Sequence, residues 1–146
     1  MKNDRMARNY IEQAAKKLKQ VERAVQDGWW PIAVRQSQEC VEQSLKAALR
    51  FVGIEPPKWH DVREILLENK ERFPAWFAQE VEALSNISKK LSEVRELSFY
   101  GDEEAGKTPD ELFGEADARQ AFEGAKKTYE LCHRIIFGGL LNRDEP

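Results

Sequence analysis

Apolar side chains recur along this chain at alternating steps of three and four residues, the spacing of one face of an α-helix. A first stripe covers residues 7–25, and Gly28 follows it as a helix-ending signal. A second stripe covers residues 34–52 and follows Pro31, a residue that suits the first turn of a helix. The polar Gln38 interrupts this stripe, so we expect it either at a helix end or in a hydrogen bond. Both segments are predicted to be long amphipathic helices.

The middle of the chain is predicted to hold a short helix and a third long helix. Successive prolines at 56–57 keep the preceding segment extended. Either His60 or Asp61 is then expected to cap a short helix over residues 62–66. The next apolar stripe begins at a proline and predicts one long helix over residues 74–100.

The segment 101–117 has a different composition from the rest of the chain. It holds seven acidic residues, one lysine, three glycines and one proline. This composition predicts a long solvated loop with one helical turn around residues 109–113. Asp102, Glu103 and Glu104 could bind a cation, but acidic runs are usually solvated, and we expect that here. A last stripe over residues 118–136 predicts the final long helix.

Four long amphipathic helices and one short helix predict an all-α fold, an antiparallel up-and-down bundle. Each stripe must be covered by the others, and each Å² of apolar surface buried contributes about 25 cal/mol. We find no β pattern of any length and no internal repeat. The chain is expected to form a single bundle domain over residues 1–137, followed by a loose C-terminal tail over residues 138–146.

Composition and charge exclude several classes of protein. Hydrophobic residues make up 41% of the chain and charged residues 34%, which argues against a disordered protein. The formal charge of −3 argues against a protein that coats DNA. The first residues contain no apolar core, and no segment approaches 18 apolar residues. We therefore expect a cytoplasmic protein without a secretory signal or a membrane span.

The cysteines and histidines are too few to form a Cys/His zinc cage with any familiar spacing in one chain. We therefore expect neither a metal nor another cofactor. Cys40 and Cys132 fall on apolar stripes, so they are predicted to be reduced core thiols. A disulfide between them is possible if their helices are neighbours. His133 lies off the stripe and is predicted to be exposed.

Residues 30–50, 59–62 and 95–102 carry motifs that together resemble the HEPN domain family, the higher eukaryotes and prokaryotes nucleotide-binding domain. Residues 30–50, WPIAVRQSQECVEQSLKAALR, are similar to its second helix, which has an aromatic start and a Val-Glu-Gln/Lys-x-Leu-Lys-Ala pattern. Residues 59–62, WHDV, resemble its Thr-His-Asp-Leu segment, and residues 95–102, RELSFYGD, resemble the end of its fourth helix. The resemblance extends over roughly residues 5–137.

The resemblance implies a cytoplasmic helical bundle that forms homodimers, often encoded beside a minimal nucleotidyltransferase as a toxin–antitoxin-like pair. Family members with an arginine followed after four to six residues by a histidine are metal-independent endoribonucleases. Here Arg95 is followed by Tyr100 at the histidine position. Tyrosine titrates near pH ~10 and histidine near ~6.5, so tyrosine is a poor proton shuttle at neutral pH. Arginine can still bind a phosphate through two hydrogen bonds.

We therefore predict a dimeric module that binds nucleotide or RNA phosphate through Arg95 and partners a nucleotidyltransferase. Tyr100 is predicted either to contact the ligand or to pack on the helix end. Lys46 and Arg50, one helical turn apart, either form a basic rim of the site or are solvated. The alternative is an endoribonuclease that uses Arg95 with Tyr100 or His60, although His60 can equally have a structural role beside a helix start.

Two further alternatives concern the surface of the bundle. Trp29, Trp30 and Phe99 are expected at helix ends, where they either plug the bundle or form a dimer interface, because aromatic residues are enriched at interfaces. A plain helical scaffold without a ligand is the third functional possibility. It would be favoured if Arg95 were paired with a nearby acid such as Glu93 or Glu96.

Overall fold

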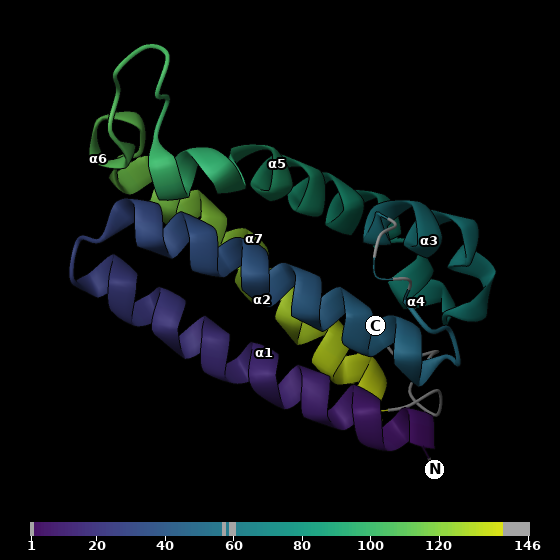
Figure 1. Cartoon of the computed structure of the whole chain (residues 1–146). Coiled ribbons are helices and arrows are strands. Elements are labelled where there is room, and N and C mark those ends of the chain that lie inside the picture. The colour runs from purple at the N-terminus through teal and green to yellow at the C-terminus, as the bar shows by residue number, and fades with distance from the viewer. Residues whose placement is uncertain (1, 57, 59–60, 139–146) are drawn as a thin grey trace.

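The computed structural model describes residues 2–56, 58 and 61–138, and these residues are mostly helical (Figure 1). Four long helices form the bundle: α1 (Lys2–Gln26), α2 (Trp30–Phe51), α5 (Val81–Tyr100) and α7 (Glu115–Gly138). The turn after α1 contains Gly28 at φ +74°, a left-handed conformation that glycine adopts without strain. Pro31 occupies the first turn of α2. The predictions for residues 7–25, 34–52 and 118–136 are therefore confirmed.

Short helical segments connect the long ones: α3 (Val62–Glu68), the 3₁₀ helix η1 (Lys70–Arg72), α4 (Ala75–Ala78) and α6 (Pro109–Leu112). The predicted single helix over residues 74–100 is wrong, because the chain interrupts it between α4 and α5. At the break, the Glu80 N–H donates to the Phe77 carbonyl at 2.8 Å, three residues back. Packing explains the break, since the Phe77 ring stacks on Phe73 with centroids 4.6 Å apart. The described chain thus has more short helices than the one predicted.

The four long helices alternate in direction along the chain, as expected for an up-and-down bundle (Figure 1). α2 packs against α1, α5 and α7, so it lies at the centre of the arrangement. α2 and α7 consequently run parallel and pack side by side. In a bundle whose neighbouring helices are all antiparallel, these two helices would not be neighbours. Small buried side chains on α2, including Ala33, Ser37 and Ala47, allow this close packing on several faces. α5 and α7 both rest on α2 but contact each other only sparsely.

One main hydrophobic core fills the bundle. Its largest fully buried side chains come from α1, α2, α4, α5 and α7 and include Ile11, Leu45, Phe77, Leu84 and Ile135. A smaller cluster near the α1–α2 turn contains Val21, Ala24, Val25, Ala33 and Ala118. The apolar stripes identified from the sequence therefore face inward, as the helical period requires.

The acidic segment 101–117 is more structured than a solvated loop. The Asp102 and Lys107 backbones pair through two hydrogen bonds of 2.8 and 2.9 Å. Thr108 then starts α6 with a capping box, in which its hydroxyl accepts from the Glu111 N–H and the Glu111 carboxylate accepts from the Thr108 N–H. The predicted helical turn around residues 109–113 is confirmed by α6. The 101–108 loop projects from the end of the bundle, beyond α5 (Figure 1).

Of the two residues predicted to cap the short helix, His60 and Asp61, the structure shows Asp61 in this role. Asp61 is the N-cap of α3, accepting a hydrogen bond of 2.9 Å from the Arg63 N–H. The Arg63 guanidinium also bonds this carboxylate and thereby lowers the pKa of Asp61. His60 and residues 139–146 of the expected tail lie outside the described residues. Among the helices that are described, none has the length and apolar character needed to cross a bilayer.

Candidate functional site

Arg95 lies on α5, where it faces the exposed edge of α2. Its Nη1 donates to the Gln38 Oε1 at 2.7 Å and to the Glu39 Oε2 at 3.3 Å. Gln38, the polar residue on the apolar stripe of α2, is therefore hydrogen-bonded, as one of the two alternatives predicted. The Arg95 side chain remains 39% exposed. In the described chain its hydrogen bonds use Nη1 alone, so the Nη2 and Nε edge is open to a further acceptor.

Glu39 connects three helices at this site. It extends from α2 and binds Arg95 of α5, while its Oε1 lies 3.2 Å from the Lys17 Nζ of α1. One carboxylate therefore holds two cations in place. Arg95 is therefore paired with an acid, which is the feature named for the scaffold alternative, although that acid is Glu39 of α2 and not Glu93 or Glu96.

A second guanidinium contacts the same aromatic ring as Arg95. The Arg35 Cζ is 4.2 Å from the centroid of the Phe99 ring, and the Arg95 Cζ is 5.1 Å from the same centroid. Stacking on an aromatic face is favourable for arginine and leaves its N–H groups at the edge available. No carboxylate among the described residues pairs with Arg35. We name Lys17, Arg35, Gln38, Glu39, Arg95 and Phe99 the Arg95 cluster; its formal charges sum to +2.

Tyr100 comes directly after Phe99 in the sequence and is the last residue of α5. Its ring stacks on Phe99 with centroids 5.7 Å apart, and the residue is 65% exposed. The structure therefore brings together Arg95 and Tyr100, two of the four residues predicted to bind phosphate, with an aromatic ring between them.

Lys46 and Arg50 lie further along α2. From Glu39 they are about 10 and 16 Å away along the helix axis, from the 1.5 Å rise per residue. The Lys46 Nζ pairs with Glu42 at 3.2 Å, within the same helix. Arg50 pairs loosely with Glu55 at 3.8 Å and lies over the Tyr10 ring at 5.3 Å. These contacts give both side chains local partners and do not join them to the Arg95 cluster.

The two histidines and the acidic loop complete the predicted candidates. His133 is exposed on α7, as predicted, with its ring 4.6 Å from that of Phe137, and it is not among the contacts of Arg95. Within the described ranges, no group of three or more His, Cys, Asp or Glu side chains is placed to hold a metal ion. In the loop, Asp102 instead accepts a hydrogen bond of 3.1 Å from the Ala105 N–H.

The aromatic residues at the helix ends fall into two groups. Trp30 is half-buried and packs against the core. Trp29 is 54% exposed and Phe99 is 39% exposed. The α1–α2 turn that carries Trp29 and the end of α5 that carries Phe99 lie at the same end of the bundle (Figure 1).

Both cysteines are buried and free, which confirms them as core thiols without a disulfide. The Cys40 Sγ donates to the Ala14 carbonyl at 3.5 Å. Burial raises the pKa of Cys40 to about 12 and also raises the pKa of Cys132. Neither thiol therefore ionises near neutral pH, and neither belongs to a reactive site.

Sequence reasoning missed Lys17, Arg35 and Glu39 as members of the site. Each is an ordinary charged residue beside an apolar stripe, and nothing in its local pattern distinguishes it. The usable signal was Gln38, because a polar residue on a buried stripe needs a partner. The identity of that partner depends on which helices pack together.

Comparison with known proteins agrees with this architecture. The family model described as HEPN domain matches residues 7–135, which is most of the chain. Neither the curated proteins nor the solved structures give a match. The match includes α2 and α5 in full, most of α1 and α7, and the Arg95 cluster, and on this ground the chain belongs to the HEPN domain family.

Proposed function

We propose that this protein is a dimeric module that binds the phosphate groups of a nucleotide or RNA at the Arg95 cluster. Membership of the HEPN domain family indicates a module related to nucleotides or RNA. The observation that carries the proposal is the local excess of positive charge: Lys17 and Arg95 share the single carboxylate of Glu39, and Arg35 lies over the Phe99 ring that Arg95 also contacts. This excess arises on a chain whose formal charge is −3.

The geometry suits a phosphate in particular. The open Nη2 and Nε edge of Arg95 matches the two-oxygen geometry that phosphate offers, and Arg35 adds a second guanidinium on the same ring. A bound phosphate would compete with Glu39 for Arg95 while gaining contact with Arg35. The exposed face of Tyr100 is available to a base, and stacking of a base on an aromatic ring contributes about 1–3 kcal/mol.

Replacing Arg95 by alanine is expected to weaken the binding of ATP and of a short single-stranded RNA by about tenfold, because one charge-assisted hydrogen-bonding group is lost. Isothermal titration with each ligand measures this. Arg23→Ala is the matched control, since Arg23 also pairs with one carboxylate, Asp27, and is well exposed. Glu39→Gln should tighten binding several-fold, because it removes the competing carboxylate. Equal affinities in wild type and Arg95→Ala would contradict the site.

The same RNA, incubated in a chelator, tests the ribonuclease alternative. If the wild-type protein cleaves the RNA and Tyr100→Phe or His60→Ala does not, the protein is an endoribonuclease and the proposal of a binding module is wrong. Product formation is followed on a denaturing gel at several pH values, because a base would reveal itself in the pH dependence of the rate.

We also propose a homodimer through the exposed aromatic residues Trp29 and Phe99. Light scattering on the purified protein should give twice the mass of one chain, and Trp29→Ala should lower that mass toward a single chain at the same concentration. A single-chain mass at all concentrations would contradict the dimer. The nucleotidyltransferase partner is proposed from the family resemblance, and co-purification with a minimal nucleotidyltransferase encoded beside this chain tests it.

A further inference from the structure

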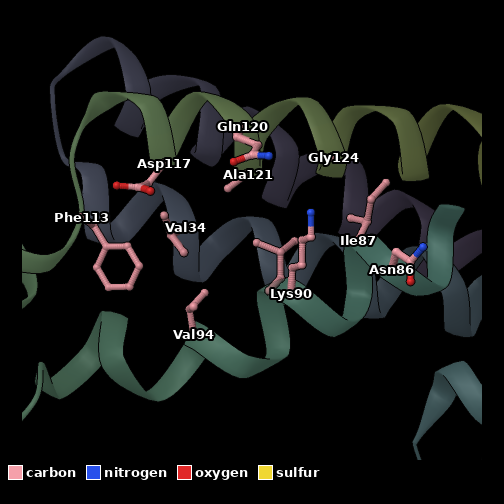
Figure 2. A pocket seen from close by; sticks show the side chains of 11 residues that line it. Val34, Asn86, Ile87, Lys90, Val94, Phe113, Asp117, Gln120, Ala121 and Gly124 are labelled. Carbon is pink, nitrogen blue, oxygen red and sulfur yellow. The ribbon is translucent and has the colours of Figure 1, made fainter.

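A groove of about 250 Å³ lies between α5 and α7 (Figure 2), and Arg95 is not among its lining residues. Most of its lining is apolar: Val34, Ile87, Leu91, Val94, Phe113 and Ala121. Val34 belongs to α2, which forms the floor. The groove is a direct result of the packing, because α5 and α7 both rest on α2 while contacting each other only sparsely.

Gly124 of α7 sets one end of the groove. A Cβ atom at this position would lie 3.0 Å from the Cγ2 of Ile87, so α5 approaches α7 closely here. Figure 2 shows Val34, Val94 and Phe113 toward the other end. The apolar space therefore extends from the close approach at Gly124 toward the ring of Phe113.

Two charged side chains border the groove, and they differ in what they bind. The carboxylate of Asp117 accepts a hydrogen bond of 2.9 Å from the Gly114 N–H. Lys90 has no carboxylate partner among the described residues, and Figure 2 shows its side chain directed from α5 toward α7. Lys90 is thus a cation next to an apolar surface, with its hydrogen-bonding capacity free for a ligand.

We propose that this groove binds a small soluble carboxylic acid with an apolar body. The carboxylate pairs with the Lys90 ammonium, and the apolar body lies against Val34, Val94 and Phe113. Concave, mostly apolar sites with a few converging polar groups are the usual form of small-molecule sites. The proposal is independent of phosphate binding at the Arg95 cluster.

Size and charge decide among the possible occupants. The volume is below the roughly 300–1,000 Å³ of sites for drug-sized ligands, so the body is one ring or a short alkyl chain. One turn of an α-helix, about 10–12 Å across and 5.4 Å long, occupies roughly 400 Å³ or more, so a helix does not fit within this volume. The lining contains one cation, Lys90, and one anion, Asp117, so it offers a single charge-assisted bond to an anion, which one carboxylate satisfies, while the second charge of a phosphate would be left unpaired and repelled by Asp117.

Octanoate, used below its micelle-forming concentration, is the probe. Isothermal titration should show binding to the wild-type protein, and Lys90→Met should weaken it about tenfold. Lys89→Met is the matched control: it makes the same change at the neighbouring position on α5, and the groove lining does not include Lys89. Octan-1-ol should bind the wild type more weakly than octanoate does. Val94→Phe, which narrows the groove, should abolish binding while circular dichroism shows the native helix content.

Any of three results with octanoate and octanol would overturn the proposal. These are no binding of octanoate to the wild type, equal losses in Lys90→Met and Lys89→Met, and octanol binding as tightly as octanoate. Arg95→Ala should leave octanoate affinity unchanged, so a failure of phosphate binding and a failure of this groove are separate outcomes. Binding that occurs only in the presence of phospholipid vesicles would likewise assign the groove to a membrane lipid and overturn a soluble ligand.

Discussion

Replacing Phe77 by alanine should lower the free energy of unfolding by about 3–5 kcal/mol, the range for removing a large aromatic side chain from a core. Phe77 is fully buried, stacks on Phe73, and meets the Trp76 ring edge-on with centroids 5.9 Å apart. Its loss leaves a cavity where α4 joins the core. Urea unfolding followed by circular dichroism measures the change.

The matched control is Phe137→Ala. Phe137 is 47% exposed near the end of α7, so its removal should change the free energy of unfolding by less than about 1 kcal/mol. Similar losses in the two variants would mean that the aromatic cluster around Phe77 is not the feature that fixes α4. A large loss in Phe77→Ala alone would show that the buried Phe77 ring stabilises the packing of α4 on the core.

Gly101→Ala should also be strongly destabilising, by about 2–3 kcal/mol. Gly101 has φ +72° and ψ −165°, a region that only glycine occupies readily. A Cβ atom would lie 2.2 Å from the Lys107 carbonyl oxygen, which accepts the Asp102 N–H. The substitution therefore breaks the pairing that folds the 101–108 loop. Thermal unfolding and hydrogen exchange of the Asp102 and Lys107 amides measure the effect.

Substitutions at two other glycines distinguish the cost of a left-handed backbone from the cost of a steric clash. Gly106 has φ +68° but no atom within 4 Å of an added Cβ, so Gly106→Ala should show only the backbone penalty of about 1–2 kcal/mol. Gly114 has open space and no left-handed φ, so Gly114→Ala should be nearly neutral. Equal effects of Gly101→Ala and Gly106→Ala would contradict a role for the contact with Lys107.

The two proposed ligand sites occupy different faces of one helix. α5 directs Arg95 and Phe99 toward α2, whereas Lys90 and Val94 line the groove between α5 and α7. Both sites follow from the central position of α2, on which α5 packs. One side of α5 carries the polar residues of the Arg95 cluster, and the other side faces α7, with which α5 makes few contacts. A change in the position of α5 would therefore alter the two sites together.

The sequence predicted the candidate site only in part. Arg95 and Tyr100 were identified from the resemblance of residues 95–102 to the end of the fourth HEPN helix, and Gln38 from its polar character on an apolar stripe. Lys17, Arg35 and Glu39 could not be identified, because their role depends on contacts between helices that are far apart in the sequence. Their charges alone are typical of any solvated helix face.

The sequence by itself determined the helical class, the four long helices and most of their ends. These features depend on local physics: the 3.6-residue period of apolar side chains, and proline and glycine at helix ends. Only the tertiary structure decided that α2 is central and lies parallel to α7, that aromatic packing interrupts the helix at Gln79 and Glu80, and that Glu39 joins Lys17 to Arg95. Those outcomes depend on how helix surfaces fit one another, and that fit is a property of the assembled molecule and of no single segment.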